Sequence, residues 1–228
     1  MRPKVFRVRD GSRAPAADRG TSVHVAIPAI QCGNFASVVN IISKAGGTAR
    51  LIHDPKELEG FDRVILAGVG AFDFGMACLE EGGWIEPLDR LARGGRVPIL
   101  GICLGMQLLC RRSDEGVRPG LGWIPADVLR IEVEPGSGLK VPHMGWNTVK
   151  VMRPNPIMPM DGEEQRYYFV HSFHAVCDEP SDVIATALHG QPLTAALGRA
   201  NVMGVQFHPE KSHRFGLALM RRFLEWTC

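Results

Sequence analysis

The sequence lacks the features that mark membrane, secreted and zinc-binding proteins. Its longest apolar run, residues 97–110, is interrupted by two glycines and is shorter than the roughly 20 residues of a membrane-spanning helix. The six cysteines form no Cys-x-x-Cys pair and have no regular spacing, so neither a zinc ribbon nor a disulfide framework is indicated. No apolar signal-peptide segment stands near the N-terminus. We therefore expect a cytoplasmic protein with reduced cysteines, no membrane contact and no metal.

The main body of the chain also lacks an excess of charge of one sign. The whole chain carries a net charge of +2, but residues 1–22 hold six Lys or Arg and two Asp. Without them the chain has 20 Lys or Arg and 22 Asp or Glu, a net charge of −2. A nucleic-acid-binding surface needs a basic stripe, so we expect no nucleic-acid partner.

Two regions are predicted from composition. Residues 1–22 are rich in Arg, Pro, Ala, Gly and Asp and lack hydrophobic periodicity, which predicts a disordered extension. Asp10 and Asp18 argue against an organelle-targeting peptide. The rest of the chain is expected to form one large domain or two small ones, since a chain with 45% hydrophobic residues can build a sizeable core.

The order of apolar segments predicts an α/β fold. Residues 23–27, 49–52 and 63–67 are short apolar runs separated by amphipathic segments, a pattern typical of a mostly parallel sheet. After Arg112 the pattern changes to short strands bounded by Gly, Pro, Asp or Asn, which predicts an antiparallel extension of the sheet. These strands are expected at residues 128–133, 148–152, 167–170, 183–188, 193–197 and 202–207.

Residues 97–109 have the pattern of a nucleophile elbow. An apolar strand meets Gly-x-Cys-x-Gly and passes at once into helix-forming residues, which puts Cys103 at a sharp turn. Gly101 and Gly105 leave room for close approach of neighbouring backbone, and the N-terminus of the helix favours a thiolate. A buried cysteine in an apolar strand is the other interpretation of this stretch taken alone.

A second strand, residues 202–207, ends at His208-Pro209-Glu210. A thiol nucleophile needs a base, and the base needs an acceptor that fixes its tautomer. Together the two strand-end motifs predict a catalytic triad of Cys103, His208 and Glu210. Because acyl transfer builds negative charge on the attacked oxygen, the backbone amide of Leu104 is the expected first oxyanion donor.

These residues also carry a family resemblance. Gly-Ile-Cys-Leu-Gly-Met-Gln and Gly-Val-Gln-Phe-His-Pro-Glu-Lys-Ser resemble the two signatures of class I glutamine amidotransferases. Residues 68–72, 142–147 and 168–172 resemble the HisH type, the glutaminase subunits of imidazole glycerol phosphate synthase, and the likeness runs from about Val23 to the C-terminus. It implies that residues 23–228 form one glutamine amidotransferase type 1 domain with a flavodoxin-like class I fold. It also implies that the protein hydrolyses L-glutamine to glutamate and ammonia without any cofactor.

The resemblance assigns further roles. It implies that Val69 or Gly70 supplies the second oxyanion donor. It also implies a substrate-binding group, made up of Gln107, Tyr168, Val170, His171 and Ser172. His171 and His174 could be taken for metal ligands, but their spacing on an extended segment points them to opposite faces.

A partner subunit is implied as well. The ammonia would pass to a HisF-type (β/α)₈ barrel synthase in a heterodimer, whose interface we expect at Asn34, Trp146 and Lys211. The segment 142–147 is expected to be a rigid apolar loop that presents Trp146. In histidine biosynthesis the acceptor would be a ribulosyl-aminoimidazole-carboxamide nucleotide. The products would be imidazole glycerol phosphate and aminoimidazole carboxamide ribotide.

Alternatives stay open at this point. Residues 29–34 depart from the Asp-Tyr-Gly-x-Gly-Asn usual in the family, while 72–76, 122–124 and 211–216 resemble paralogues associated with amidation of surface-polysaccharide sugars. Such a paralogue would keep the glutaminase chemistry and have another synthase partner. A stand-alone cysteine hydrolase would need no partner, and a non-catalytic binding module would leave Cys103 unreactive.

Overall fold

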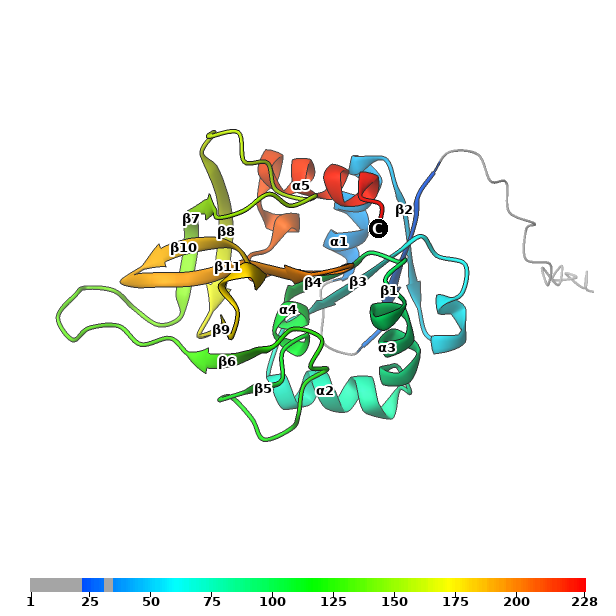
Figure 1. Ribbon diagram of the computed structural model, residues 1–228, viewed down its shortest axis with the longest axis horizontal. Coiled ribbons are helices and arrows are strands. Elements are labelled where there is room, and N and C mark those ends of the chain that lie inside the picture. Colours follow the sequence, from blue (N-terminus) through cyan, green and yellow to red (C-terminus); the bar gives the residue numbers. More distant parts are fainter. Residues whose placement is uncertain (1–21, 31–34) are drawn as a thin grey trace, which may run out of the picture.

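A nine-stranded sheet runs through the centre of the computed structural model, which describes residues 22–30 and 35–228 (Figure 1). The strand order is β2-β1-β3-β4-β12-β11-β10-β7-β8. The first five strands are parallel and the other four extend the sheet in antiparallel fashion, as predicted. The strands are β1 (His24–Pro28), β2 (Thr48–Ile52), β3 (Arg63–Gly68), β4 (Ile99–Cys103), β7 (His143–Val151), β8 (Gln165–His171), β10 (Val183–His189), β11 (Gln191–Arg199) and β12 (Val202–Val205).

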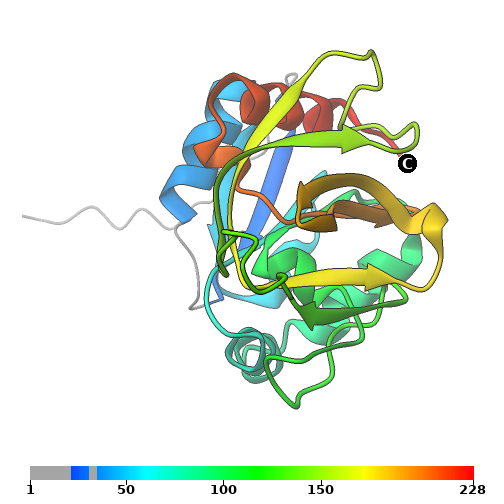
Figure 2. The same ribbon diagram turned by 90° about the vertical axis from the view of Figure 1, so that its left-hand side faces the viewer.

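Helices cover both faces of the parallel strands, which is why β3 and β4 are buried along their whole length and, apart from Arg63 at the start of β3, carry no charged or polar side chain (Figures 1 and 2). α1 and α5 pack on one face through Ile42 and Phe223, and α2, α3 and α4 pack on the other through Leu79, Leu88 and Leu108. The helices are α1 (Phe35–Ala45), α2 (Phe72–Glu81), α3 (Ile85–Gly94), α4 (Leu104–Leu108) and α5 (His213–Glu225). Short 3₁₀ helices are η1 (Pro55–Leu58), η2 (Pro180–Asp182) and η3 (Pro209–Lys211).

A second sheet was not predicted. It has the order β5-β6-β9, from β5 (Arg112–Ser113), β6 (Ala126–Arg130) and β9 (Phe173–Cys177). The chain bends at Ser172 after β8, and β9 then pairs with β6 rather than with the large sheet. The expected strand at residues 128–133 therefore belongs to this sheet and ends at Arg130.

The prediction of a loop at residues 142–147 is wrong, because most of this segment is part of a strand. β7 begins at His143 and pairs with β8 from His143 opposite His171 to Val149 opposite Gln165. Pro142 and Gly145 gave the segment the composition of a loop, and Gly145 does have a φ of +122°. Pairing with β8 nevertheless holds the segment extended.

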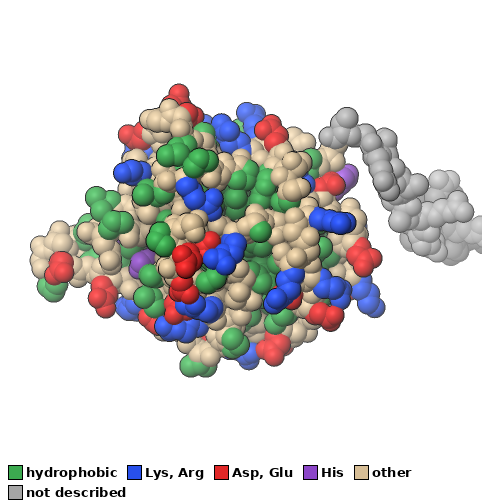
Figure 3. Space-filling model, viewed as in Figure 1, with side chains coloured by type: hydrophobic (Ala, Val, Ile, Leu, Met, Phe, Trp, Pro, Cys, Tyr) green, Lys and Arg blue, Asp and Glu red, His purple; other side chains and the backbone are tan. Residues whose placement is uncertain are grey.

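Two predictions concern residues outside the described part of the chain. They are the extension at residues 1–22, of which the structure describes only Ser22, and the interface residue Asn34. On the face that Figure 3 shows, Lys and Arg side chains are interspersed with Asp and Glu. Within residues 22–30 and 35–228, none of the helices combines the length and the apolar character needed to cross a membrane.

Candidate active site

Cys103 occupies a strained turn between β4 and α4. Its φ of +54° and ψ of −110° lie outside the regions that non-glycine residues ordinarily adopt. A Cβ on Gly105 would lie 1.8 Å from the Leu66 carbonyl oxygen, and one on Gly101 would lie 2.6 Å from the Gly105 oxygen. Both glycines are thus required by close backbone contacts, and the predicted strand-to-helix elbow is confirmed.

His208 follows the neighbouring strand β12 and is paired with Glu210. Nδ1 of His208 lies 2.8 Å from Oε1 of Glu210, and both side chains are almost fully buried. Burial acts to lower the pKa of His208, but the Cys103 sulfur and the Glu210 carboxylate outweigh it and raise the pKa to about 9. At neutral pH this environment favours the imidazolium, the state that pairs with a thiolate.

The backbone of His208 is fixed by Tyr168 and Ser212. The His208 N–H donates to the Tyr168 carbonyl at 2.9 Å, and the His208 carbonyl accepts from the Ser212 hydroxyl at 2.6 Å. The same hydroxyl accepts from the Tyr168 N–H at 3.0 Å. Nε2 of His208 has no hydrogen-bond partner in the described part of the chain. Nε2 is therefore the nitrogen available for the predicted proton exchange with Cys103.

A cavity of about 490 Å³ opens over Cys103 and His208. It brings together most of the predicted site, namely Val69, Gly70, Cys103, Leu104, Gln107, Val170, His171, Ser172 and His208. Its wall also holds four residues that were not predicted, Ala71, Glu115, Pro142 and Phe173. Gly70 has a φ of +112°, which suits the flexible loop expected of an oxyanion donor.

Tyr168 is not part of this cavity. Its ring lies 6.3 Å from that of Trp146, and Nζ of Lys211 lies 5.9 Å above it. Trp146 in turn stacks on His213, with ring centroids 5.5 Å apart and planes 3° apart. Two of the three predicted interface residues, Trp146 and Lys211, therefore meet on one surface beside the His208 turn.

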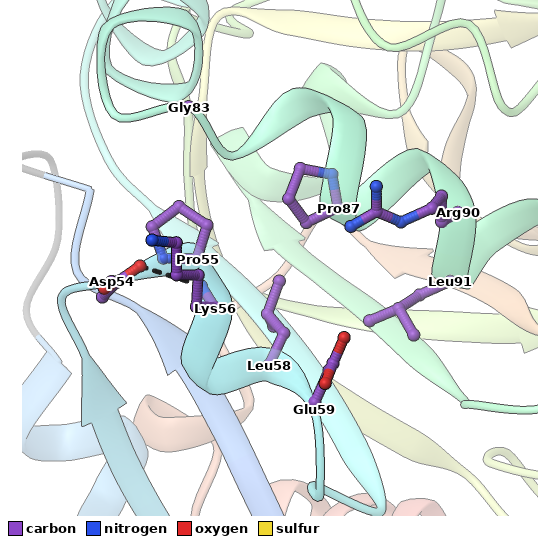
Figure 4. A pocket seen from close by; sticks show the side chains of 9 residues that line it. All are labelled: Asp54, Pro55, Lys56, Leu58, Glu59, Gly83, Pro87, Arg90 and Leu91. Atoms are coloured by element: carbon purple, nitrogen blue, oxygen red, sulfur yellow. Dashed lines mark hydrogen bonds between the residues drawn. The ribbon is translucent and has the colours of Figure 1, made fainter.

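A larger hollow of about 650 Å³ lies between η1 and α3 (Figure 4). One wall comes from η1 and its flanks, with Asp54, Lys56 and Glu59, and the other from α3, with Pro87, Arg90 and Leu91. It contains neither a cysteine nor a histidine. The smaller cavity is the candidate active site because it is lined by Cys103 and His208, the predicted nucleophile and base.

Two polar residues near the site escaped sequence reasoning. Gln206 is fully buried beside Cys103. Its position two residues before His208, at the end of the predicted strand 202–207, was the available sequence signal, although the strand itself ends at Val205 and the chain then bends. His143 Nδ1 lies 2.9 Å from His171 Nε2, and burial lowers the pKa of these residues to about 4 and about 3. The sequence alone gives no signal for this histidine pair, because only the register of β7 and β8 places His143 opposite His171.

The fold and the site define a class I glutamine amidotransferase. The family model "Glutamine amidotransferase class-I" matches residues 42–226. A structure described as a glutamine amidotransferase superposes with a TM-score of 0.68 at 21% identity, covering 88% of this chain and 97% of its own. The structure of PurLQS from Thermotoga maritima superposes with a TM-score of 0.71 at 18% identity, covering 90% and 99%.

Sequence relatives narrow the assignment. A Pseudomonas aeruginosa protein named imidazole glycerol phosphate synthase subunit HisH 2 is 45% identical over 193 residues, which are 85% of this chain and 95% of the relative. The HisH subunit of Bdellovibrio bacteriovorus is 43% identical over 194 residues, with the same two shares. The chain therefore belongs to the HisH family of class I glutamine amidotransferases.

Proposed function

We propose that this chain is the glutaminase subunit of an imidazole glycerol phosphate synthase and hydrolyses L-glutamine through Cys103, His208 and Glu210. The observation that carries the proposal is the arrangement at the ends of β4 and β12, where a strained cysteine adjoins a buried histidine–carboxylate pair. Names of the HisH relatives support the synthase assignment.

The triad chemistry proceeds in two halves. Transfer of the Cys103 proton to His208 gives the thiolate–imidazolium pair, and the thiolate attacks the side-chain amide carbon of glutamine. The imidazolium then protonates the departing nitrogen, and ammonia leaves a γ-glutamyl thioester on Cys103. Water, deprotonated by His208, attacks the thioester and releases glutamate. Glu210 holds Nδ1 of His208 throughout and stabilises the imidazolium.

Charge on the attacked oxygen is carried by backbone amides. Leu104 begins α4 directly after Cys103, and Val69 and Gly70 follow β3, which pairs with β4 at Gly68 and Cys103. We propose that N–H groups of Leu104 and of Val69 or Gly70 hold this oxygen. Gln107, Val170, His171 and Ser172 would hold the amino-acid end of glutamine.

The partner would be a HisF-type (β/α)₈ barrel that receives the ammonia. We propose that it docks on the surface around Trp146 and Lys211, where an exposed indole lies beside the turn that carries His208. The pathway would be histidine biosynthesis in the cytoplasm, where Cys103 stays reduced. All five cysteines that the structure describes are free thiols.

Glutamate release tests this function directly. We expect the protein alone to hydrolyse glutamine slowly and a HisF-type synthase with its nucleotide substrate to accelerate it by about 5–150-fold, the size of ordinary coupling between sites. Trp146→Ala should weaken the stimulation. Met160→Ala, which removes another exposed apolar side chain, is the matched control.

The other outcomes separate the alternatives. Rapid hydrolysis without a partner would identify a stand-alone cysteine hydrolase. If a HisF-type barrel gives no stimulation while a glutamine analogue still labels Cys103, the protein is a glutaminase whose partner is another synthase, such as one that amidates sugars. Unreactive Cys103 under every condition would contradict catalysis altogether.

A further inference from the structure

The side chain of Gln206 lies against the reacting sulfur. Gln206 is fully buried, and its Nε2 is 3.8 Å from Sγ of Cys103, within reach of a large sulfur acceptor. Its backbone N–H donates to the Ala195 carbonyl at 2.9 Å, which ties the main chain just after β12 to the neighbouring strand β11. Sγ thus has His208 and an amide side chain as polar neighbours.

The orientation of this amide follows from a neighbouring carbonyl group. The Phe173 oxygen can only accept, so the group of Gln107 that lies 3.2 Å from it must be the NH₂. The same NH₂ lies 3.1 Å from Gln206, which must therefore present its oxygen to Gln107. Gln206 is left with its own NH₂ facing Cys103.

A second donor, His171, holds the Phe173 carbonyl group in place. His171 Nδ1 lies 2.8 Å from the Phe173 oxygen, and His171 Nε2 lies 2.9 Å from His143 Nδ1. Nε2 of His143 is 3.0 Å from the amide nitrogen of Asn147, which donates. These groups form a row of hydrogen bonds in which Asn147 donates to His143, His143 donates to His171, and His171 donates to the Phe173 carbonyl. The carbonyl cannot turn away without breaking this row.

We propose that Gln206 is a catalytic residue whose side-chain amide, oriented by Gln107, donates a hydrogen bond to Cys103 Sγ and stabilises its thiolate. The proposal deepens the proposed function, since it rests on Cys103 as the nucleophile. A hydrogen bond to an ionised acceptor is stronger than one to a neutral acceptor, so the contact favours the thiolate over the thiol. It also limits Gln107, whose NH₂ is committed to Phe173 and Gln206, to accepting from a substrate through Oε1.

Alkylation of Cys103 by iodoacetamide, followed across pH on the isolated full chain, tests the proposal without glutamine or a synthase. We expect Gln206→Met to lower the rate at pH 7 about tenfold and to move the pH profile about one unit upward. In the active complex kcat should fall by a similar factor with little change in KM. Gln165→Met removes another buried amide away from the cavity and should leave the alkylation profile unchanged.

A second measurement uses the native side chain. The side-chain amide NMR signals of Gln206 should shift as Cys103 titrates, and this response should vanish in Cys103→Ala. An unchanged alkylation profile in folded Gln206→Met, or Gln206 signals that ignore the titration, would overturn the proposal. Failure of the proposed function would give a different result. The complex would then release no glutamate, although Gln206→Met would still change the alkylation profile of Cys103.

Discussion

Replacing Cys103 by alanine should lower glutamine hydrolysis by the synthase complex by a factor on the order of 10⁴–10⁶, as for other nucleophiles of catalytic triads. The thioester cannot form without the sulfur, and His208 then has no thiol to deprotonate. The fold should persist because the side chain is small and lies at the wall of an open cavity. Glutamate release under saturating glutamine measures the loss.

Cys110→Ala is the matched control. Cys110 is buried just beyond α4, its Sγ donates to the Met106 carbonyl, and burial raises the pKa of its thiol. A thiol of this kind is inert, so hydrolysis should stay close to that of the unmodified protein. Equal losses in the two variants, or a fully active Cys103→Ala, would contradict the assignment of the nucleophile.

Gly105→Ala should destabilise the protein by at least about 3 kcal/mol, the upper part of the range for overpacking. Its Cβ would lie 1.8 Å from the Leu66 oxygen and 2.7 Å from the Leu66 carbonyl carbon. Both are backbone atoms of β3, which is paired with β1 and β4 and cannot move without opening the sheet. Urea unfolding, or loss of soluble protein, measures the effect.

Gly94→Ala is the control for this change. Gly94 is the last residue of α3, and nothing lies within 4 Å of the Cβ that alanine would add. Alanine is the better helix former by up to about 1 kcal/mol, so stability should stay the same or rise. Similar stabilities for Gly105→Ala and Gly94→Ala would show that the close approach at the elbow does not hold in solution.

Most of the parallel half of the fold was predictable because its inner strands, β1, β3, β4 and β12, are buried on both faces. Apart from Arg63, β3 and β4 are apolar, and this leaves short apolar runs in the sequence. α2 was missed for a local reason. It starts at Phe72 after the N-cap residue Ala71, whose side chain cannot accept a capping hydrogen bond, and it contains Gly75, so it lacks a clear start signal and carries a poor helix former.

The edge of the sheet was harder to predict because pairing there decides the structure. β7 carries Gly145 at positive φ and is held extended by pairing with β8 along residues 143–149 and with β10 at residues 149–151. β9 follows β8 after a bend at Ser172, so the sequence has no gap long enough to signal a second sheet. Tyr168 shares a face with Val170 but stands two residues farther from the end of β8, and this keeps it out of the cavity.

The site divides along similar lines. Cys103, His208 and Glu210 belong to two motifs at strand ends, and adjacent parallel strands bring such ends together. The amide row from Phe173 through Gln107 to Gln206 joins three separate elements, and its direction depends on distances that spacing along a chain does not encode. The motifs thus predicted the reacting groups but not their hydrogen-bonded support.

Covalent labelling of the wild-type protein by a diazoketone analogue of glutamine, read by peptide mass spectrometry, shows whether Cys103 is the nucleophile. We expect a single adduct at Cys103, formed faster in the presence of the synthase partner and suppressed by excess glutamine. Cys78, Cys177 and Cys228 serve as internal controls, since none lines the cavity. No adduct at Cys103, or equal labelling of the other cysteines, would contradict a glutaminase built on this residue.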